Sequence, residues 1–232
     1  MSNRRNFIKK SIIGITGVAA LPIIIKSEKK QPVEKNKKMI YRTLGRTGIK
    51  LPIISMGVMN ADNPNLVKTS LDSGIVHFDT AHFYQRGKNE EMVGQIVKNY
   101  PKESYFIATK VPGFHEDRKT GNVNQNANAK MFLEKFELSL KRLQMKSVDL
   151  LYLHSVKSKE GATFKPLMKA MSDLKKQGKI KYIGISTHRN EPEVIRAAVD
   201  CKLYDVVLTA YNFKQPHVKD VKNANVNYFS AD

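Results

Sequence analysis

Four polar residues at the ends of three short apolar runs have side chains suited to proton transfer. Asp79 and Tyr84 lie in VHFDTAHFY, Lys110 ends FIATK, and His154 ends DLLYLH. An α/β fold builds its reaction centre from polar groups at the carboxyl ends of successive parallel strands. A carboxylate, a phenol, a cation and an imidazole together indicate proton transfer to a carbonyl oxygen. We call these four residues the candidate tetrad.

The four side chains suggest a division of labour. A tyrosine hydroxyl is a weak acid at neutral pH unless a neighbouring cation stabilises its phenolate. We therefore expect Tyr84 to be the general acid, Lys110 to stabilise its phenolate, and Asp79 to hold Lys110. His154 would hydrogen-bond the substrate carbonyl and position it. Taken singly, each has another explanation. Asp79 could cap a helix and Tyr84 could be a loop aromatic. Lys110 could be ion-paired or form a Schiff base, and His154 could be a hydrogen-bond partner of the backbone.

Alternating strand-like and helix-like segments must position the candidate tetrad. YRTLGRTGIKLP has the turn chemistry of a hairpin. After it we expect strands at 52–58, 76–81, 105–110, 148–153, 180–186 and 206–212. The helical patterns between them cover 64–73, 88–99, 130–143, 163–178 and 191–201. The strand runs are continuously apolar, as in parallel strands covered on both faces.

Strict alternation of strands and helices leaves a barrel or a doubly wound sheet. No G-x-G-x-x-G follows the first expected strand and the sequence contains no P-loop, which favours the barrel. A complete barrel takes about 250 residues, whereas 40–232 comprises 193. The sequence therefore predicts an α/β fold of the (β/α)8 TIM-barrel type over 39–232. We expect only about six βα units, with truncation after the sixth strand.

The N-terminal segment indicates export. Arg4 and Arg5 precede Phe7, and an apolar stretch follows over 12–25, which is short for a membrane span. This pattern resembles a twin-arginine signal over 1–25, with an uncleaved signal-anchor as the alternative. The resemblance implies the twin-arginine export machinery as a partner. The expected location is periplasmic, or membrane-anchored and facing the periplasm. The charged stretch 26–38 is predicted to be a linker.

Charge and cysteine content narrow the function classes. The net charge is +19, but residues 1–50 alone hold 13 Lys or Arg against two Asp or Glu. The remaining excess is spread over expected helix surfaces, and no nucleic-acid-binding motif is present, so we expect no nucleic-acid partner. Cys201 is the only cysteine, which excludes an intrachain disulfide and a multi-cysteine metal site. We predict no metal site.

Together the motifs resemble the aldo-keto reductase family. The matching stretches are TLGRTGIKLPIISMG, HFDTAHFYQRGKNEEMVG, FIATKV, SLKRLQMKSVDLLYLH and KIKYIGIST, in that order, between about Met39 and Phe213. The resemblance places that family's catalytic Asp, Tyr, Lys and His on the candidate tetrad. It also implies a TIM barrel that uses NADPH, less often NADH, to reduce an aldehyde or ketone without a metal.

The cofactor positions carry over less completely. Ser186 matches a serine that in the family contacts the nicotinamide, whereas Thr187 replaces the usual asparagine. Leu208 stands where a glutamine is usual, and Tyr211 matches again. The resemblance thus implies Ser186, Thr187 and Tyr211 as cofactor contacts. Between Asp79 and Tyr84 in the sequence, the dipeptide His82-Phe83 either lines the substrate mouth or belongs to a surface loop.

Three functions stay open at this point. The first is an exported NAD(P)H-dependent oxidoreductase that reduces a small carbonyl compound, with Tyr84 as general acid. The second is a catalytically inactive remnant or binding protein of the same fold. The third is an aldolase that forms a Schiff base on Lys110. Neither the substrate nor the oligomeric state follows from the sequence.

Overall fold

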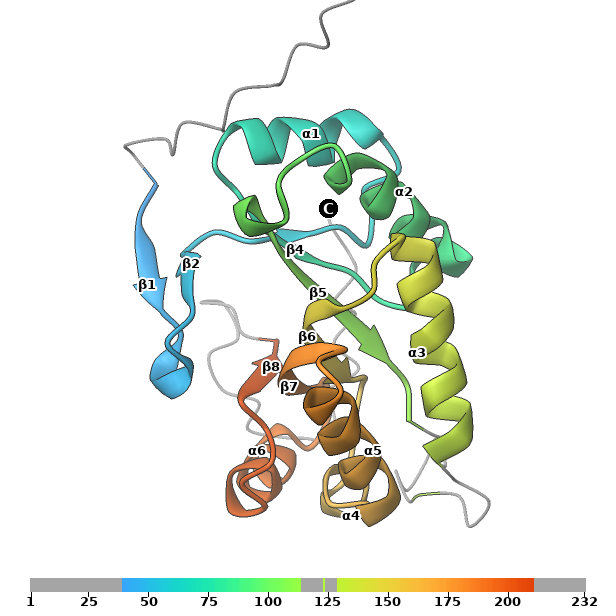
Figure 1. The fold of residues 1–232 in the computed structure, drawn as a ribbon. Helices are drawn as coiled ribbons and strands as arrows, with labels where there is room; N and C mark the ends of the chain where they lie inside the picture. Colours follow the sequence, from blue (N-terminus) through green and yellow to red (C-terminus); the bar gives the residue numbers. More distant parts are fainter. Residues whose placement is uncertain (1–38, 114–122, 124–128, 211–232) are drawn as a thin grey trace, which may run out of the picture. The chain divides into compact units, whose positions relative to one another are not determined.

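The computed structural model describes residues 39–113, 123 and 129–210 of the 232-residue chain. The predicted signal segment 1–25 and linker 26–38 lie outside these residues, so both stay predictions. The described part folds around one parallel sheet with helices against it (Figure 1).

The central sheet has six parallel strands that follow one another in chain order. They are β3 (Met56–Gly57), β4 (His77–Asp79), β5 (Phe106–Val111), β6 (Val148–Leu153), β7 (Ile180–Thr187) and β8 (Val206–Thr209). A doubly wound sheet would reverse its order at a switch point, and this sheet shows no reversal across its six described strands. The predicted barrel-type α/β fold is therefore confirmed in the form of a half-barrel sheet.

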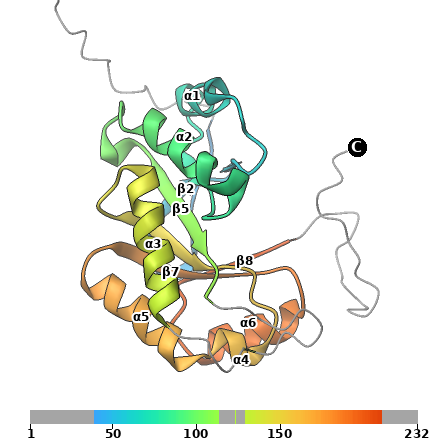
Figure 2. The ribbon, with the colours of Figure 1, turned by 90° about the vertical axis from the view of Figure 1, so that its right-hand side faces the viewer.

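Six α-helices connect the strands in the described ranges (Figures 1 and 2). They are α1 (Pro64–Asp72), α2 (Lys88–Val97), α3 (Ala129–Leu143), α4 (Lys159–Ala162), α5 (Lys165–Lys176) and α6 (Glu191–Asp200). The helix expected over 163–178 is α5, which begins at Lys165 because Pro166 favours the first turn, whereas the short helix α4 before it was not predicted. Gly178 follows the end of α5 with a φ of 71°, a left-handed conformation that favours glycine.

The hairpin before the sheet forms as predicted, but the strand expected after it is mostly wrong. β1 (Tyr41–Thr43) pairs antiparallel with β2 (Lys50–Pro52). The amide of Ile53 still donates to the carbonyl of Ile40, so the hairpin pairing extends into the segment predicted as a buried strand. Ile53 and Ile54 are each 53% exposed, and the sheet strand β3 is only two residues long. An apolar run alone cannot distinguish these two outcomes.

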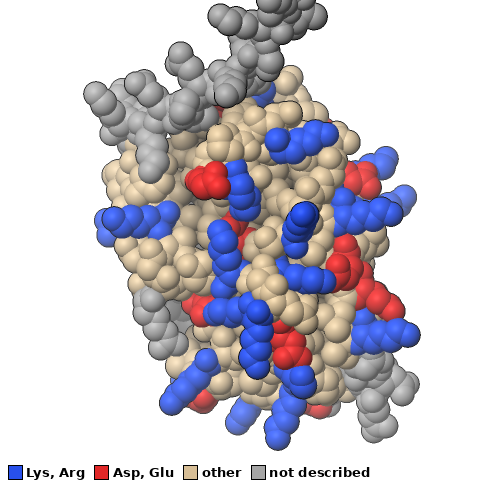
Figure 3. All heavy atoms as spheres, viewed as in Figure 1, with Lys and Arg blue, Asp and Glu red and all other residues tan. Residues whose placement is uncertain are grey.

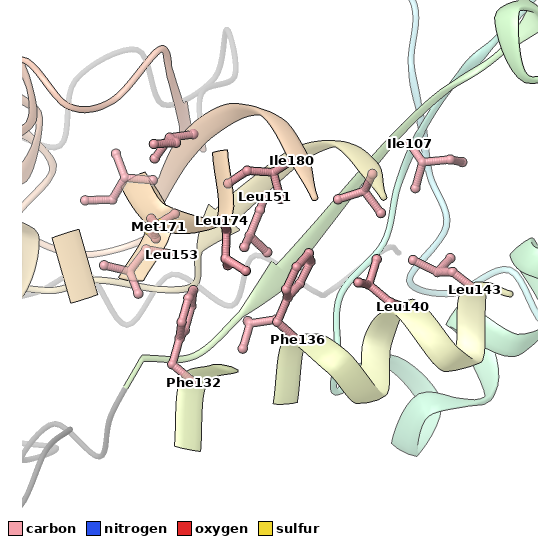
Figure 4. Packing of buried hydrophobic residues seen from close by; sticks show 14 of the residues in the cluster. Ile107, Phe132, Phe136, Leu140, Leu143, Leu151, Leu153, Met171, Leu174 and Ile180 are labelled. Carbon is pink, nitrogen blue, oxygen red and sulfur yellow. The ribbon is translucent and has the colours of Figure 1, made fainter. Parts of the chain in front are cut away.

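The outer face of the sheet carries the larger core. Helix α3 directs Phe132, Phe136, Leu140 and Leu143 toward the strands, and all four are buried (Figure 4). Their spacing of three or four residues puts them on one helix face. They pack with outward side chains of neighbouring strands, among them Ile107, Leu151 and Leu153. Burial of each such side chain contributes about 1.5–3 kcal/mol, so this layer holds β5 and β6 in place.

The inner face of the sheet has a second, smaller cluster. Alternate residues of the strands, including Ala108, Leu150 and Tyr152, pack there with Leu51 of the hairpin. Gly184 lies opposite Tyr152, and a Cβ on that glycine would be 2.3 Å from the tyrosine ring. The inner face therefore holds a bulky aromatic only because β7 has a glycine at this register.

Two aspartates secure the pairing of neighbouring strands. Asp149 in β6 accepts a hydrogen bond from the amide of Ile107 in β5 (2.9 Å) and contacts the ammonium groups of Lys102 and Lys181 at 2.7 and 2.8 Å. Asp205, just before β8, accepts from the amide of Ile183 in β7 in the same way (2.8 Å). Each aspartate satisfies a backbone donor of the preceding strand, and this fixes neighbouring strands in register.

The surface view agrees with the expected scatter of basic groups. On the face shown in Figure 3, Lys and Arg side chains are interspersed with Asp and Glu rather than gathered into one patch. No helix within 39–113 and 129–210 is long and apolar enough to cross a membrane.

Candidate active site

The structure brings Asp79, Tyr84 and Lys110 together around one ammonium group. The Nζ of Lys110 is bound to Asp79 and donates to the Oη of Tyr84 at 3.3 Å. It also donates to the backbone carbonyl of Thr80 at 2.9 Å. Lys110 is buried, whereas Asp79 and Tyr84 are partly exposed. A buried cation thus faces a phenol that solvent or a substrate can reach.

Strand pairing explains why these three residues meet. Asp79 ends β4 and pairs in register with Ala108 of β5, one step before Lys110 on the same face. Beyond Asp79, the amide of Thr80 donates to the carbonyl of Ala108, and the amide of His82 donates to that of Lys110. The loop that carries Tyr84 therefore stays against β5 after the strand has ended.

His154 follows β6 and completes the group. Its amide donates to the carbonyl of Val111 (3.0 Å), and its ring lies 6.2 Å from that of Tyr84, nearly perpendicular at 82°. Burial, and next the charge of Lys110, lower the pKa of the His154 imidazole to about 3. His154 is therefore neutral at physiological pH and has one N–H available as a donor.

Tyr152 forms the inner wall beside Lys110. Its ring centroid lies 6.0 Å from the Nζ of Lys110, a distance at which the cation and the ring attract each other. Burial, with the charge of Asp79 adding to it, raises the pKa of the Tyr152 phenol above its usual value. Tyr152 is therefore an uncharged wall residue at neutral pH.

The predicted cofactor contacts differ in where they lie. Ser186 is buried on the inner face of β7, and its hydroxyl accepts the amide of Ser155 at 2.9 Å. Thr187 alternates to the other face, and its hydroxyl donates to the carbonyl of Arg189 at 2.7 Å. Tyr211 lies outside the described residues. Of the two that the structure describes, only Ser186 shares the inner face with Lys110, and all three assignments stay predictions.

His82 and Phe83 lie in different environments, one buried and the other exposed. His82 is buried against α3, where its Nδ1 lies 3.1 Å from the Oγ of Ser139. Burial, then the charges of Arg142 and Lys135, lower the pKa of His82 to about 4. Phe83 is 57% exposed beside Tyr84 and is the one of the pair that can meet a ligand.

Asn89 supports the site and was not predicted from the sequence. Asn89 is fully buried, accepts the hydroxyl of Thr80 at 2.6 Å and donates to the carbonyl of Val58 at 2.6 Å. It thereby fastens the start of α2 to the loops after β3 and β4. The available signal was NEE at the start of an expected helix, where an interior-facing asparagine needs partners.

The described part of the chain shows no group of side chains suited to bind a metal ion. Within 39–113, 123 and 129–210, no three His, Cys, Asp or Glu side chains are grouped to hold a metal ion. The electrostatic centre of the site is instead the ammonium of Lys110.

Comparison with known proteins places this chain in a family. The sequence profile of the aldo/keto reductase family matches residues 55–226. The chain therefore belongs to the aldo/keto reductase family. That match includes all four residues of the candidate tetrad.

Individual relatives agree. The chain is 29% identical over 171 residues to an L-glyceraldehyde 3-phosphate reductase of Escherichia coli K12, covering 68% of this chain and 48% of that one. It is 36% identical over 129 residues to the NADP(+) aldo-keto reductase yakc of Schizosaccharomyces pombe, covering 53% and 36%. A solved structure of a Bacillus halodurans aldo-keto reductase in its holo form superposes with a TM-score of 0.61 at 28% identity, covering 75% and 58%.

The shared part is less than the length of these relatives. The chain spans about half of the Escherichia coli relative and about a third of the Schizosaccharomyces pombe one. Family membership is therefore shown, while the activity of this chain is a matter for proposal and test.

Proposed function

We propose that this protein is an NAD(P)H-dependent oxidoreductase that reduces a small aldehyde or ketone. The single observation that carries the proposal is the contact of the buried Lys110 ammonium with Asp79 and with the hydroxyl of Tyr84. Family membership and a relative named for NADP(+) support the choice of redox chemistry and cofactor class.

Each side chain has a defined task in this reaction. A bound nicotinamide cofactor would supply the hydride that adds to the carbonyl carbon. Tyr84 donates its hydroxyl proton to the carbonyl oxygen, and the product is an alcohol. The Lys110 ammonium, 3.3 Å away, stabilises the phenolate that is left on Tyr84. Neutral His154 donates a hydrogen bond to the same carbonyl oxygen and orients it.

The described residues fit part of the cofactor's needs. A carboxamide has both a donor and an acceptor, and the Ser186 hydroxyl on the inner face suits it as a partner. Thr187 would contribute through the shape of the strand end, since its hydroxyl is engaged with Arg189. The assignment of Tyr211 rests on the sequence resemblance alone.

The contacts of Lys110 argue against a Schiff-base aldolase. A Schiff base forms on a neutral amine that can approach the substrate carbonyl. The Nζ of Lys110 is instead buried and directed at three oxygen acceptors, those of Asp79, Thr80 and Tyr84. A nitrogen held by three acceptors is poorly placed to attack a substrate carbonyl.

Hydride transfer assays test the proposal. NADPH and NADH oxidation would be followed with a panel of simple aldehydes and ketones, using the full chain and its Tyr84→Phe variant. We expect turnover in the wild type and a kcat lower by about 10²- to 10⁴-fold in Tyr84→Phe. Tyr100→Phe is the matched control, because its hydroxyl only reaches the exposed Asp72 at 3.4 Å.

The possible outcomes separate the three functions. Equal activity of Tyr84→Phe and wild type would disprove the role of Tyr84. A wild type that folds and binds NADPH without turnover would indicate a binding protein instead. Trapping of a carbonyl compound on Lys110 by borohydride would favour the aldolase.

A further inference from the structure

The turn that carries Tyr84 has a strained backbone. Gln85, Arg86 and Gly87 follow Tyr84 with φ angles of 51°, 57° and 93°. The left-handed conformation costs a non-glycine residue about 1 kcal/mol or more and persists only where the surroundings impose it. Two such residues in succession, next to the proposed general acid, require an external support.

Helix α3 supplies this support from one side. Arg142 donates from Nη1 to the backbone carbonyl of His82 at 2.9 Å, and Ser139, one turn earlier, contacts the His82 ring. The guanidinium of Arg142 also packs against Gly87, where an added Cβ would lie 2.2 Å from its Cζ. Arg142 therefore contacts the turn both before and after Tyr84.

A buried carboxylate holds Arg142 in turn. Glu90 in α2 is completely buried, and its Oε2 lies 3.4 Å from the Nη1 of Arg142. Its Oε1 accepts the hydroxyl of Thr109 at 2.7 Å. A buried charge of this kind is retained only where it is paired and hydrogen-bonded. Thr109, Glu90 and Arg142 thus form one connected polar network.

The network begins on the strand that carries Lys110. Thr109 and Lys110 are consecutive in β5, so their side chains point to opposite faces of the sheet. Lys110 reaches Tyr84 on the inner face, and Thr109 reaches the Tyr84 turn through Glu90 and Arg142 on the outer face. One strand therefore fixes the turn from both sides.

The far side of the turn has its own anchor. The Nε2 of Gln85 donates to the backbone carbonyls of Met59 and Ala61, at 3.1 and 3.2 Å. With Arg142 on one flank and Gln85 on the other, the strained residues are held at both ends.

We propose that Arg142, fixed by Glu90, is a positioning residue that keeps the hydroxyl of Tyr84 within hydrogen-bonding reach of Lys110. The role of Tyr84 in this statement rests on the proposed reductase function. The positioning itself rests only on the contacts above. A planar guanidinium suits the task because it can pack flat on Gly87 while donating to two acceptors.

Hydrogen exchange tests the positioning without requiring turnover. The amides of Tyr84, Arg86 and Lys88 are hydrogen-bonded within the turn, so they report its opening. In Arg142→Met we expect them to exchange about tenfold faster or more, with the amides of β5 unchanged. Lys141→Met, an exposed lysine of the same helix turn, should leave all of them at wild-type rates.

Steady-state kinetics then tests the catalytic consequence. We expect Arg142→Met to lower kcat by about 10²-fold while KM changes little, since misplacement of a reacting group affects the transition state most. Arg142→Lys keeps a cation for Glu90 but loses the planar contact with Gly87, so it should recover part of kcat. The double variant Glu90→Gln/Arg142→Met removes both charges, which guards against misfolding from an unpaired carboxylate.

The outcomes distinguish this inference from the proposed function. Wild-type exchange of the turn amides in a folded Arg142→Met or Glu90→Gln/Arg142→Met protein would overturn the inference. If the wild type is active, a kcat of Arg142→Met equal to that of the wild type would overturn it as well. Equal acceleration in Lys141→Met would overturn it too. Faster exchange in a protein whose wild type lacks turnover would support the positioning and reject the reductase.

Discussion

Lys110 donates a hydrogen bond to the hydroxyl of Tyr84 at 3.3 Å from an ammonium that is itself bound to Asp79. The lysine is 3% exposed and the aspartate 17%. This burial makes the pair a part of the fold as well as of the site, because neither charge is fully solvated. Changes at Lys110 are therefore expected to affect both stability and chemistry.

Lys110→Met should abolish reduction and also destabilise the protein. The change leaves the carboxylate of Asp79 without its cation, at a cost of about 3 kcal/mol for a largely buried pair. The double variant Lys110→Met/Asp79→Asn removes both charges and should recover most of this stability while staying inactive. Urea denaturation and the NADPH assay measure the two effects. A fully stable and active Lys110→Met protein would contradict the assigned role.

Two of the histidines with lowered pKa values, His82 and His154, predict a loss of stability in acid. His82 and His154 have pKa values of about 4 and about 3 in the folded state, both lowered chiefly by burial, against an ordinary value of 6.5. At pH values between the folded-state pKa and 6.5, these histidines bind protons in the unfolded chain but not in the folded chain. The free energy of unfolding therefore falls as pH decreases from 6.5 toward 4.

Denaturation at several pH values measures this effect. His82→Asn removes one of the titrating groups, so the decrease between pH 6.5 and pH 4 should be smaller than in the wild type. The imidazole NMR signals of His82 and His154 should show no titration near pH 6.5. An identical slope in His82→Asn, together with ordinary titration of its signal in the wild type, would refute the prediction.

Asp149 should contribute more to stability than either of its lysine partners. Its burial raises the pKa of the carboxyl, but hydrogen bonds from Lys102, Lys181 and the amide of Ile107 outweigh this and lower it overall. Asp149→Ala leaves the amide of Ile107 without its acceptor and should cost about 1–3 kcal/mol. Lys181→Met is the control, since Lys181 is 64% exposed and should cost less than about 1 kcal/mol.

The same pKa shift sets a pH window. A carboxyl with a lowered folded pKa stabilises the protein above its ordinary value of 3.8, and this contribution is lost as pH falls below that value. Asp149→Ala should therefore lose less stability than the wild type on going from pH 5 to pH 3. Equal losses in both proteins would show that Asp149 does not act through its charge.

Export is a prediction from the N-terminal sequence. Replacing Arg4 and Arg5 together by lysine should stop the appearance of the protein in the periplasmic fraction of a host with a twin-arginine pathway. Lys29→Arg/Lys30→Arg is the control, because it changes basic residues of the expected linker with no change in charge. Fractionation and immunoblotting give the readout. Undiminished export of the Arg4→Lys/Arg5→Lys variant would contradict a twin-arginine route.

The strands of the sheet were largely predictable because their runs are long and apolar. The expected strand at 148–153 coincides with β6, and those at 105–110 and 180–186 differ from β5 and β7 by a single residue at one or both ends. The prediction of the first strand was wrong because the apolar run PII suits both a buried sheet strand and a hairpin. In the structure this run continues the hairpin pairing and is not buried in the sheet. Local composition does not show which partner strand a segment will find.

The candidate tetrad could be found in the sequence because its chemistry and its placement coincide. Each member follows an apolar strand run, and parallel strands present their carboxyl ends at one edge of a sheet. The supporting residues lacked such a signal. Arg142 lies 60 residues from His82 and 52 from Glu90 in the chain, and all three resemble ordinary polar residues of helices and loops.

By itself, the sequence determined the order of most strands and helices, the barrel-type fold and the choice of Asp79, Tyr84, Lys110 and His154 as the candidate tetrad. These depend on local periodicity and on residue type, which the chain carries at each position. Only the tertiary structure decided that Arg142 and Glu90 support the turn after Tyr84. Those relationships arise where α2 and α3 pack against the sheet and against one loop, and such contacts depend on distances that no local pattern encodes.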